Sequence, residues 1–279
     1  MSAEPQQPAP AAVPGYVKTL DGSPLYCVYH PAAPVANPQR RYYPTLLLPS
    51  LFEERKSGYA ALRRLAERLA AAGHATLRFD YRGSGESGGD PAKRRWQHLA
   101  EDTAVARKTL ARLAGARDSV LIGLRLGATL ALQETIRVGG EGVIALAPVV
   151  KGASQVRLWK MRSKIRSELT QANSAQEKAE RSTTTDEVLD FDGYEVNKNF
   201  FDDVAKIDLL KDLAALSCPG LVLQLSHRTD AAPETLELLK TLGSRAKQSC
   251  MRIEAFWDKV DDVETRPVED AVLKWLEQI

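Results

Sequence analysis

The amino-acid sequence predicts an α/β fold, in which a mostly parallel sheet carries helices on both faces and a small helical cap. Short apolar runs alternate along the chain with longer segments whose apolar residues recur every three or four positions. The run Thr45–Leu51 is almost continuously apolar, as expected for a strand that is buried on both faces. With 279 residues, the chain is long enough to form one large domain with a sizeable core.

Composition narrows the class of protein further. Hydrophobic residues make up 44% of the chain and charged residues 27%, as in ordinary globular domains. A net charge of +2 gives no reason to expect a nucleic-acid partner, and no segment has the length and apolarity of a membrane span. The cysteines Cys27, Cys218 and Cys250 lack metal-site spacing, so we expect reduced thiols, a cytoplasmic protein, and neither metal nor cofactor. Residues 1–14 are rich in proline and alanine and predict a disordered leader.

The individual elements follow in chain order from these patterns. An antiparallel pair of strands opens the fold, because the turn signal Asp21-Gly22 separates two strand-like runs. Strands are predicted at Gly15–Asp21, Leu25–His30, Thr45–Leu51, Ala75–Tyr81, Ser119–Leu124, Gly142–Val149, Gly220–Ser226 and Cys250–Phe256. Helices are predicted at 62–72, at 96–113, after Gly127 and at Val268–Ile279.

One segment interrupts this alternation. Residues 151–192 contain no strand of the main sheet, so we expect a cap there, with the core formed by 15–150 and 193–279. Val156–Leu169 predicts a basic amphipathic helix, whereas Gln171–Asp186 is polar and predicts little structure. The apolar stripe of this helix is expected to be Leu158, Met161, Ile165 and Leu169, and its basic residues are Arg157, Lys160, Arg162, Lys164 and Arg166.

The turn Gly123-Leu124-Arg125-Leu126-Gly127 joins an apolar strand to an alanine- and leucine-rich helix. Strand, turn, helix and both glycines match the G-x-S-x-G nucleophile elbow, in which serine occupies the central position. Here that position is Arg125. A guanidinium stays protonated and has no free lone pair, so it cannot attack a carbonyl group.

Two further motifs accompany the elbow. Phe79–Ser87 is similar to a D-x-R-G-x-G-x-S loop, and His227–Pro233 is similar to the G-x-x-D-x-x-x-P loop that delivers a catalytic acid. With the elbow, they resemble the α/β-hydrolase superfamily, in its serine-aminopeptidase-like part, over roughly residues 45–279. Narrower motifs are similar to those of the exosortase-associated hydrolases of type 2: Leu48–Lys56, Trp96-Gln97-His98, Gly123-Leu124-Arg125, Ala147–Gly152 and Phe256-Trp257.

The resemblance implies a degenerate triad. Arg125 occupies the nucleophile position and Asp230 the acid position, while the base position near Trp257 and Asp258 holds no histidine. Because two of the three groups are unsuited to their roles, we expect a non-catalytic protein that binds a ligand or partner. The alternative is an ester or amide hydrolase with relocated groups, in which Ser226, His227 and Asp230 would cooperate. In the simpler interpretation, His227 only ends a strand.

Arg125 at a helix N-terminus requires a compensating carboxylate, because the helix dipole disfavours a cation there. Glu53 or Glu54 is the first candidate, Asp230 the second and Asp258 the third. Two interpretations stay open. Arg125 forms only an internal salt bridge, or its guanidinium and the N–H of Leu126 bind a small anionic ligand, a carboxylate or a phosphate.

The basic helix also has two interpretations. Arg157, Lys160, Arg162, Lys164 and Arg166 surround Trp159, a combination that can lie on an anionic membrane surface or against a protein. A solvated cap helix, with long basic side chains around an apolar stripe, explains the same pattern.

Overall fold

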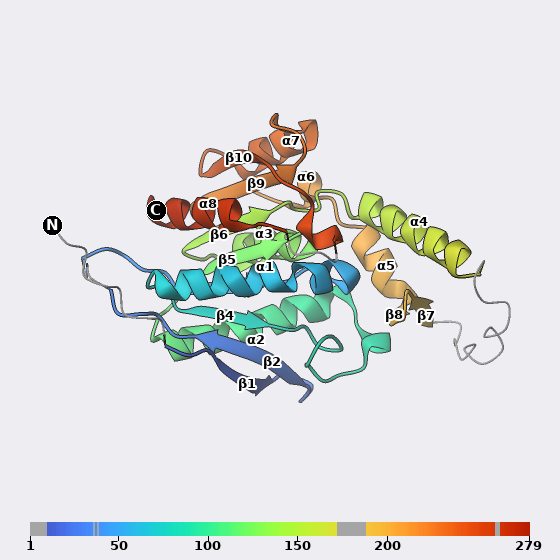
Figure 1. Ribbon diagram of the computed structural model, residues 1–279, viewed down its shortest axis with the longest axis horizontal. Coiled ribbons are helices and arrows are strands. Elements are labelled where there is room, and N and C mark those ends of the chain that lie inside the picture. The colour runs from blue at the N-terminus through green and yellow to red at the C-terminus, as the bar shows by residue number, and fades with distance from the viewer. Residues whose placement is uncertain (1–9, 36, 38, 172–187, 260–262) are drawn as a thin grey trace.

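The computed structural model describes residues 10–35, 37, 39–171, 188–259 and 263–279. Within them, eight strands form one sheet in the order β1-β2-β4-β3-β5-β6-β9-β10, and two strands form a separate hairpin, β7-β8 (Figure 1). The strands are β1 Val13–Lys18, β2 Pro24–His30, β3 Thr45–Leu48, β4 Thr76–Phe79, β5 Val120–Leu124, β6 Gly142–Leu146, β7 Val188–Phe191, β8 Tyr194–Asn197, β9 Gly220–Ser226 and β10 Ala246–Arg252.

The pairing of these strands confirms the predicted fold class. β1 and β2 are antiparallel to each other, β2 is antiparallel to β4, and every other neighbouring pair in the large sheet is parallel. β5 lies between β3 and β6, so the carboxyl ends of three buried strands meet at one edge of the sheet. Ligands of open α/β sheets bind at that edge, and the turn after β5 starts there.

Helices cover both faces of the sheet (Figure 1). They are α1 Phe52–Ala71, α2 Trp96–Ala114, α3 Leu126–Val138, α4 Gly152–Gln171, α5 Lys198–Ala205, α6 Leu209–Asp212, α7 Pro233–Leu242 and α8 Arg266–Leu276, with 3-10 turns η1 Pro91–Lys93 and η2 Phe256–Asp258. Alternate residues of each strand point to opposite faces. Leu47 therefore packs with α1 and α8, whereas Leu46 and Leu48 pack with α2 and α3.

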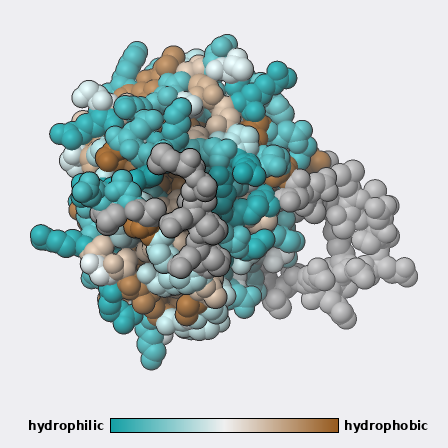
Figure 2. Space-filling view, turned by 60° about the vertical axis from the view of Figure 1, so that its left-hand side comes forward, coloured by the Kyte–Doolittle hydropathy of each residue, from teal (hydrophilic) through white to brown (hydrophobic). Residues whose placement is uncertain are grey.

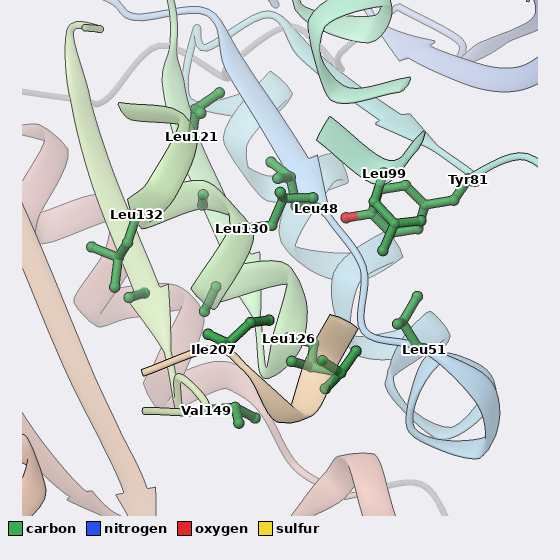
Figure 3. Close-up of a cluster of buried hydrophobic side chains, with 14 of the residues drawn as sticks. Leu48, Leu51, Tyr81, Leu99, Leu121, Leu126, Leu130, Leu132, Val149 and Ile207 are labelled. Atoms are coloured by element: carbon green, nitrogen blue, oxygen red, sulfur yellow. The ribbon is translucent and has the colours of Figure 1, made fainter. Parts of the chain in front are cut away.

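The hydrophobic core on the α2–α3 face fixes the N-terminal ends of α1 and α3. Figure 3 shows Leu126 from the first turn of α3 and Leu51 from the turn before α1, together with Val149 and Ile207. Leu51 is 2% exposed and Leu126 is 1% exposed. The residues that begin both helices are thus fixed by packing, which positions the backbone groups that follow them.

Several helices and strands begin or end at other residues than the sequence predicts. α1 begins at Phe52, so Glu53 and Glu54 lie in its first turn and not in a loop. The last strand is Ala246–Arg252, not Cys250–Phe256, because it is an edge strand whose burial alternates and which lacks a continuous apolar run. Phe256 lies in η2 instead.

The cap layer also differs from its prediction. α4 begins at Gly152 and buries Gln155, Val156 and Trp159, whereas Met161 and Ile165 of the predicted apolar stripe are 54% and 50% exposed. The expected cap boundary at 192 falls in the turn of the β7-β8 hairpin. The hairpin and α5 therefore continue the layer that α4 begins (Figure 1). Most of the segment predicted to be weakly structured, 172–186, lies outside the described residues.

The first strand begins earlier in the chain than predicted. β1 begins at Val13, inside the range predicted as a leader, and residues 1–9 lie outside the described part. Figure 2 shows one face on which hydrophilic side chains predominate and hydrophobic ones are scattered. None of the described helices has the length and apolarity needed to cross a membrane.

Candidate functional site

Arg125 lies at the turn between β5 and α3, where its φ of 56° and ψ of −117° place a non-glycine residue in a sparsely populated conformation. Close packing maintains the turn. A Cβ at Gly123 would lie 2.2 Å from the Gly127 carbonyl oxygen, and a Cβ at Gly127 would lie 2.3 Å from that of Leu48. Both glycines are therefore required, and the backbone has the form of a nucleophile elbow.

The guanidinium of Arg125 is held by neighbours within the chain. Nη1 donates to the carbonyl oxygen of Ala147 at 3.1 Å, and Nη2 donates to Oε1 of Gln155 at 2.8 Å. Nε lies 3.5 Å from Oε2 of Glu54, which makes an ion pair but not an aligned hydrogen bond. The guanidinium carbon lies 5.3 Å from the centre of the Trp257 ring, within the range of a cation–π contact.

Glu54 is the buried carboxylate of this network, with only 3% of the residue exposed. Its Oε2 accepts a hydrogen bond from Ser50 Oγ at 2.7 Å, and its Oε1 accepts one from Gln155 Nε2 at 2.9 Å. Gln155 thus bridges the two charges. Burial of Glu54 and partial burial of Arg125 are tolerated because most of their other donors and acceptors are hydrogen-bonded.

The neighbouring Glu53 has a different role. Its Oε1 accepts a hydrogen bond from the hydroxyl of Tyr194 at 3.0 Å, which ties α1 to the β7-β8 hairpin. Of the adjacent glutamates, Glu54 is the one that pairs with Arg125. Leu126, whose N–H belongs to the first turn of α3, is 1% exposed.

Trp257 and Asp258, at the predicted base position, lie in η2 close to the elbow. Trp257 stacks on Arg125, and Asp258 forms two hydrogen bonds with Arg162 of α4, at 2.7 and 2.9 Å. These hydrogen bonds raise the pKa of Arg162 above its usual value. The pair ties the cap helix to the loop that follows the last strand.

The predicted acid position lies apart from this network. Asp230 is exposed, and its carboxylate contacts only Thr229 among the described residues. His227 is also exposed, and the Ser226 hydroxyl donates to the carbonyl oxygen of Arg228. No hydrogen bond joins the side chains of Ser226, His227 and Asp230 in the described part of the chain.

The other histidines and nucleophiles give no substitute triad. His30, His74 and His98 contact Arg78, the main chain of Tyr43 and the main chain of Arg95, respectively. Among the described residues, no serine, threonine or cysteine forms a hydrogen bond with a histidine ring, since the Thr76 hydroxyl donates only to the main-chain oxygen of His74, and no three metal-ligating side chains cluster. The Ser84 and Ser87 hydroxyls donate to the carbonyl oxygens of Tyr81 and Asp80, as loop caps do.

A cavity of about 130 Å³ lies beside the Arg125 network, between α1, η2 and the cap. Four carboxylates, one guanidinium and four large aromatic rings contribute to its walls. The lining residues are Phe52, Glu53, Glu54, Ser57, Trp159, Arg162, Phe191, Asp192, Trp257 and Asp258. The aromatic rings and the excess of negative charge suit a neutral or cationic group better than an anion.

Sequence reasoning missed Gln155 and Ser50, which complete the network around Glu54. A glutamine on a helix carries no sequence signal of a contact about thirty positions away. The stacking of Trp257 was equally hidden, although its proximity could have been inferred from its place at the base position.

A family model described as "Serine aminopeptidase, S33" matches residues 55–217. None of the curated proteins compared with the chain matches it.

Solved structures show the same fold at low identity. Est1E from Butyrivibrio proteoclasticus, with ferulic acid bound, is 16% identical with a TM-score of 0.64, over 95% of this chain and 98% of that one. The esterase PF2001 from Pyrococcus furiosus is 15% identical with a TM-score of 0.65, over 96% and 91%. A proline iminopeptidase from Mycobacterium smegmatis is 14% identical with a TM-score of 0.63, over 95% and 98%.

Proposed function

Because this chain belongs to the serine aminopeptidase S33 family of α/β-hydrolases, we propose that it is a binding protein built on a hydrolase fold. In this proposal the chain has lost the serine nucleophile and the histidine base, and it retains the cleft. The observation that carries the proposal is Arg125 at the elbow, engaged by Glu54, Gln155 and the Ala147 carbonyl.

The chemistry of the site supports binding over hydrolysis. Acyl transfer needs a nucleophile that a neighbouring base deprotonates. Arg125 supplies neither group, and the indole ring of Trp257 beside it cannot accept a proton. Asp230 cannot orient a base that is absent, and its exposed carboxylate contacts only Thr229 in the described part of the chain.

The ligand would occupy the cavity beside Trp257. The sequence suggested a small anion at Arg125, but the positive charge of this residue is already met by Glu54. The cavity wall carries Glu53, Asp192 and Asp258 as well, with Arg162 as the one cation among its lining residues. We therefore favour a neutral or cationic small molecule at this position.

Activity-based labelling tests the proposal. We expect the purified protein to react with neither a fluorophosphonate probe nor p-nitrophenyl acetate above the rate of a heat-denatured sample. Covalent labelling at any serine would contradict the proposal and support the alternative, an ester or amide hydrolase with relocated groups. Ser84→Ala and Ser226→Ala variants would then identify the serine responsible.

A second variant tests the assignment of the triad. Arg125→Ser restores the usual elbow residue, yet we expect no turnover because no histidine occupies the base position near Trp257 and Asp258. An active Arg125→Ser protein would mean that a base acts from a position other than Trp257. Circular dichroism provides the control that the variant is folded.

Three finer proposals rest on the sequence. We propose a cytoplasmic location because the cysteines are free. We propose a role beside exosortase systems because the narrower motifs resemble their hydrolases. Contact of 156–169 with a membrane surface or a protein is the third, and the exposed Met161 and Ile165 beside Arg157 and Lys160 support it. No nucleic-acid partner is proposed.

A further inference from the structure

A second and larger cavity, of about 450 Å³, shares Phe52 with the cavity beside the Arg125 network. Three elements enclose it: the glycine-rich loop of residues 83–89, the N-terminal end of α1, and the turn of the β7-β8 hairpin. Its volume is within the range of small-molecule sites. Its floor contains Arg94, which none of the motifs discussed above includes.

Arg94 is a buried cation, with 4% of the residue exposed. Its Nη1 donates to the carbonyl oxygen of Gly83 at 3.4 Å, a long hydrogen bond, and its Nε has no acceptor. The guanidinium carbon lies 5.5 Å from the Phe52 ring centre and 5.4 Å from that of Phe200. In the described part of the chain no carboxylate lies within ion-pair distance of Arg94.

The buried carboxylate that acts electrostatically on Arg94, that of Asp102, is hydrogen-bonded to another arginine, Arg82. Asp102 is fully buried, and its two oxygens accept hydrogen bonds from the Nε and the backbone N–H of Arg82, both at 2.8 Å. Arg82 also pairs with Asp21 and Glu101. Arg82 thus has three acidic partners, whereas Asp102 acts on Arg94 only at longer range, without an ion pair in the described part of the chain.

An unpaired buried cation is costly, because it has lost its hydration without gaining an opposite charge. Burial lowers the pKa of Arg94 to about 10, so its guanidinium is still charged at neutral pH. The two aromatic faces and one carbonyl oxygen offset only part of that cost. A group that brings a negative charge into the cavity would supply the rest.

We propose that this cavity binds a small organic carboxylate, whose negative charge pairs with the buried, unpaired guanidinium of Arg94. A planar carboxylate can accept two parallel hydrogen bonds from an arginine. Leu51 and Phe52 line the same cavity, so the N-terminal end of the α1 dipole also favours an anion there.

The charges around the cavity favour a single negative charge. Arg55, the other arginine in the wall, already pairs with Asp80 at 3.1 Å. Glu195 lies at the exposed rim and would repel a second negative charge. Phe52 and Tyr194 provide aromatic wall, which suits a carboxylate carried on an apolar or aromatic body.

The inference does not depend on the proposed loss of catalysis. Arg94 lies outside the Arg125 network, and an active hydrolase could hold a carboxylate at Arg94 equally well. A protein that labels with fluorophosphonate and also binds a carboxylate through Arg94 would overturn the first proposal and support this one.

Calorimetric titration with benzoate tests the site. We expect wild type to bind benzoate and to bind benzamide, the uncharged analogue, at least tenfold more weakly. Arg94→Met should lose at least tenfold in benzoate affinity, and Arg94→Lys should fall between. The matched control is Lys93→Met, which removes a neighbouring exposed cation and should bind benzoate as wild type does.

Three results would overturn the inference. They are equal affinity for benzoate and benzamide, unchanged benzoate affinity in Arg94→Met, and an equal loss in Lys93→Met. Phenyl phosphate binding tenfold more tightly than benzoate would overturn the assignment of a monoanionic carboxylate. If Arg94→Met does not fold, wild type with benzoate and benzamide, and Arg94→Lys, still decide the outcome.

Discussion

Two arginines of the cleft region differ in what surrounds them: Arg94, of which 4% is exposed, and Arg125, whose side chain is 16% exposed. Arg125 has an ion pair, two hydrogen bonds and an aromatic face, all supplied by its own chain. Arg94 has two aromatic faces, one long hydrogen bond and, among the described residues, no carboxylate within ion-pair distance. Arg125 and Glu54 form an internal ion pair, which we call the clamp. Arg94 lacks such a partner, and we call its surroundings the incomplete site.

The difference shows that a conspicuous residue need not be the one that meets a ligand. Arg125 attracts attention because it stands where a serine is expected, yet its charge is neutralised within the fold. Arg94 lies in an ordinary stretch between a 3-10 turn and α2, and only its surroundings reveal it. Whether a buried ion has a partner of opposite charge is therefore a better indicator of a ligand site than an unexpected residue at a motif position.

The largest change in stability is expected when the carboxylate of the clamp is removed. Glu54→Gln leaves Arg125 partly buried without an opposite charge, so we expect the free energy of unfolding to fall by about 3 kcal/mol. Urea denaturation measures it. Glu53→Gln is the control, because it changes the adjacent carboxylate, whose hydrogen bond in the described part of the chain is with Tyr194, and its effect should stay below about 1 kcal/mol.

Equal losses in the two glutamate variants would mean that the ion pair contributes nothing specific. A loss below about 1 kcal/mol in Glu54→Gln would mean that the neutral amide still satisfies Arg125, and the clamp would then be a polar contact and not a charge pair.

The sequence predicts the central part of this fold well because burial there is complete. β9 was predicted with its observed bounds, and β3, β5 and β6 overlap their predictions, since strands covered on both faces are apolar at every position. At the sheet edge β10 is half exposed and alternates, so its predicted position slipped toward Phe256. Chain pattern predicts elements best where solvent is excluded.

The site is less predictable, because side-chain contacts depend on elements far apart in the chain. The elbow turn and the position of Trp257 follow from local motifs. The contact of Gln155 with both Arg125 and Glu54 requires knowing which turn of the cap helix lies over the elbow. The unpaired state of Arg94 requires knowing that Arg82 already occupies Asp102.

The second test measures how Arg94 affects the stability of the ligand-free protein. Arg94→Met replaces an unpaired buried cation by an apolar chain, which removes a desolvation cost along with two cation–π contacts. These effects oppose each other, so we expect stability within about 1 kcal/mol of wild type. Thermal and urea unfolding in ligand-free buffer measure it. A loss of stability as large as that in Glu54→Gln would mean that Arg94 is as well compensated within the fold as Arg125.

The smallest expected effect comes from an arginine–carboxylate pair that is more exposed than the pair of Arg125 and Glu54. Arg162 and Asp258 form two short hydrogen bonds, but their side chains are 40% and 27% exposed. Water replaces most of what Asp258→Asn removes, so we expect a loss of only about 0.5 kcal/mol. Because the geometry of this pair is better than that of Arg125 and Glu54, a small loss here would identify burial as the cause of the larger one.

The effect of Asp258→Asn should also be local. The pair joins α4 to η2, so backbone amides of residues 152–165 should exchange with deuterium faster than in wild type, while those of β5 and β6 should not change. Glu234→Gln, which alters the exposed partner of Lys151, serves as the control and should leave exchange in α4 unaltered. Faster exchange throughout the sheet would mean that this exposed pair supports the whole fold, and exposure could then no longer separate the two kinds of arginine pair.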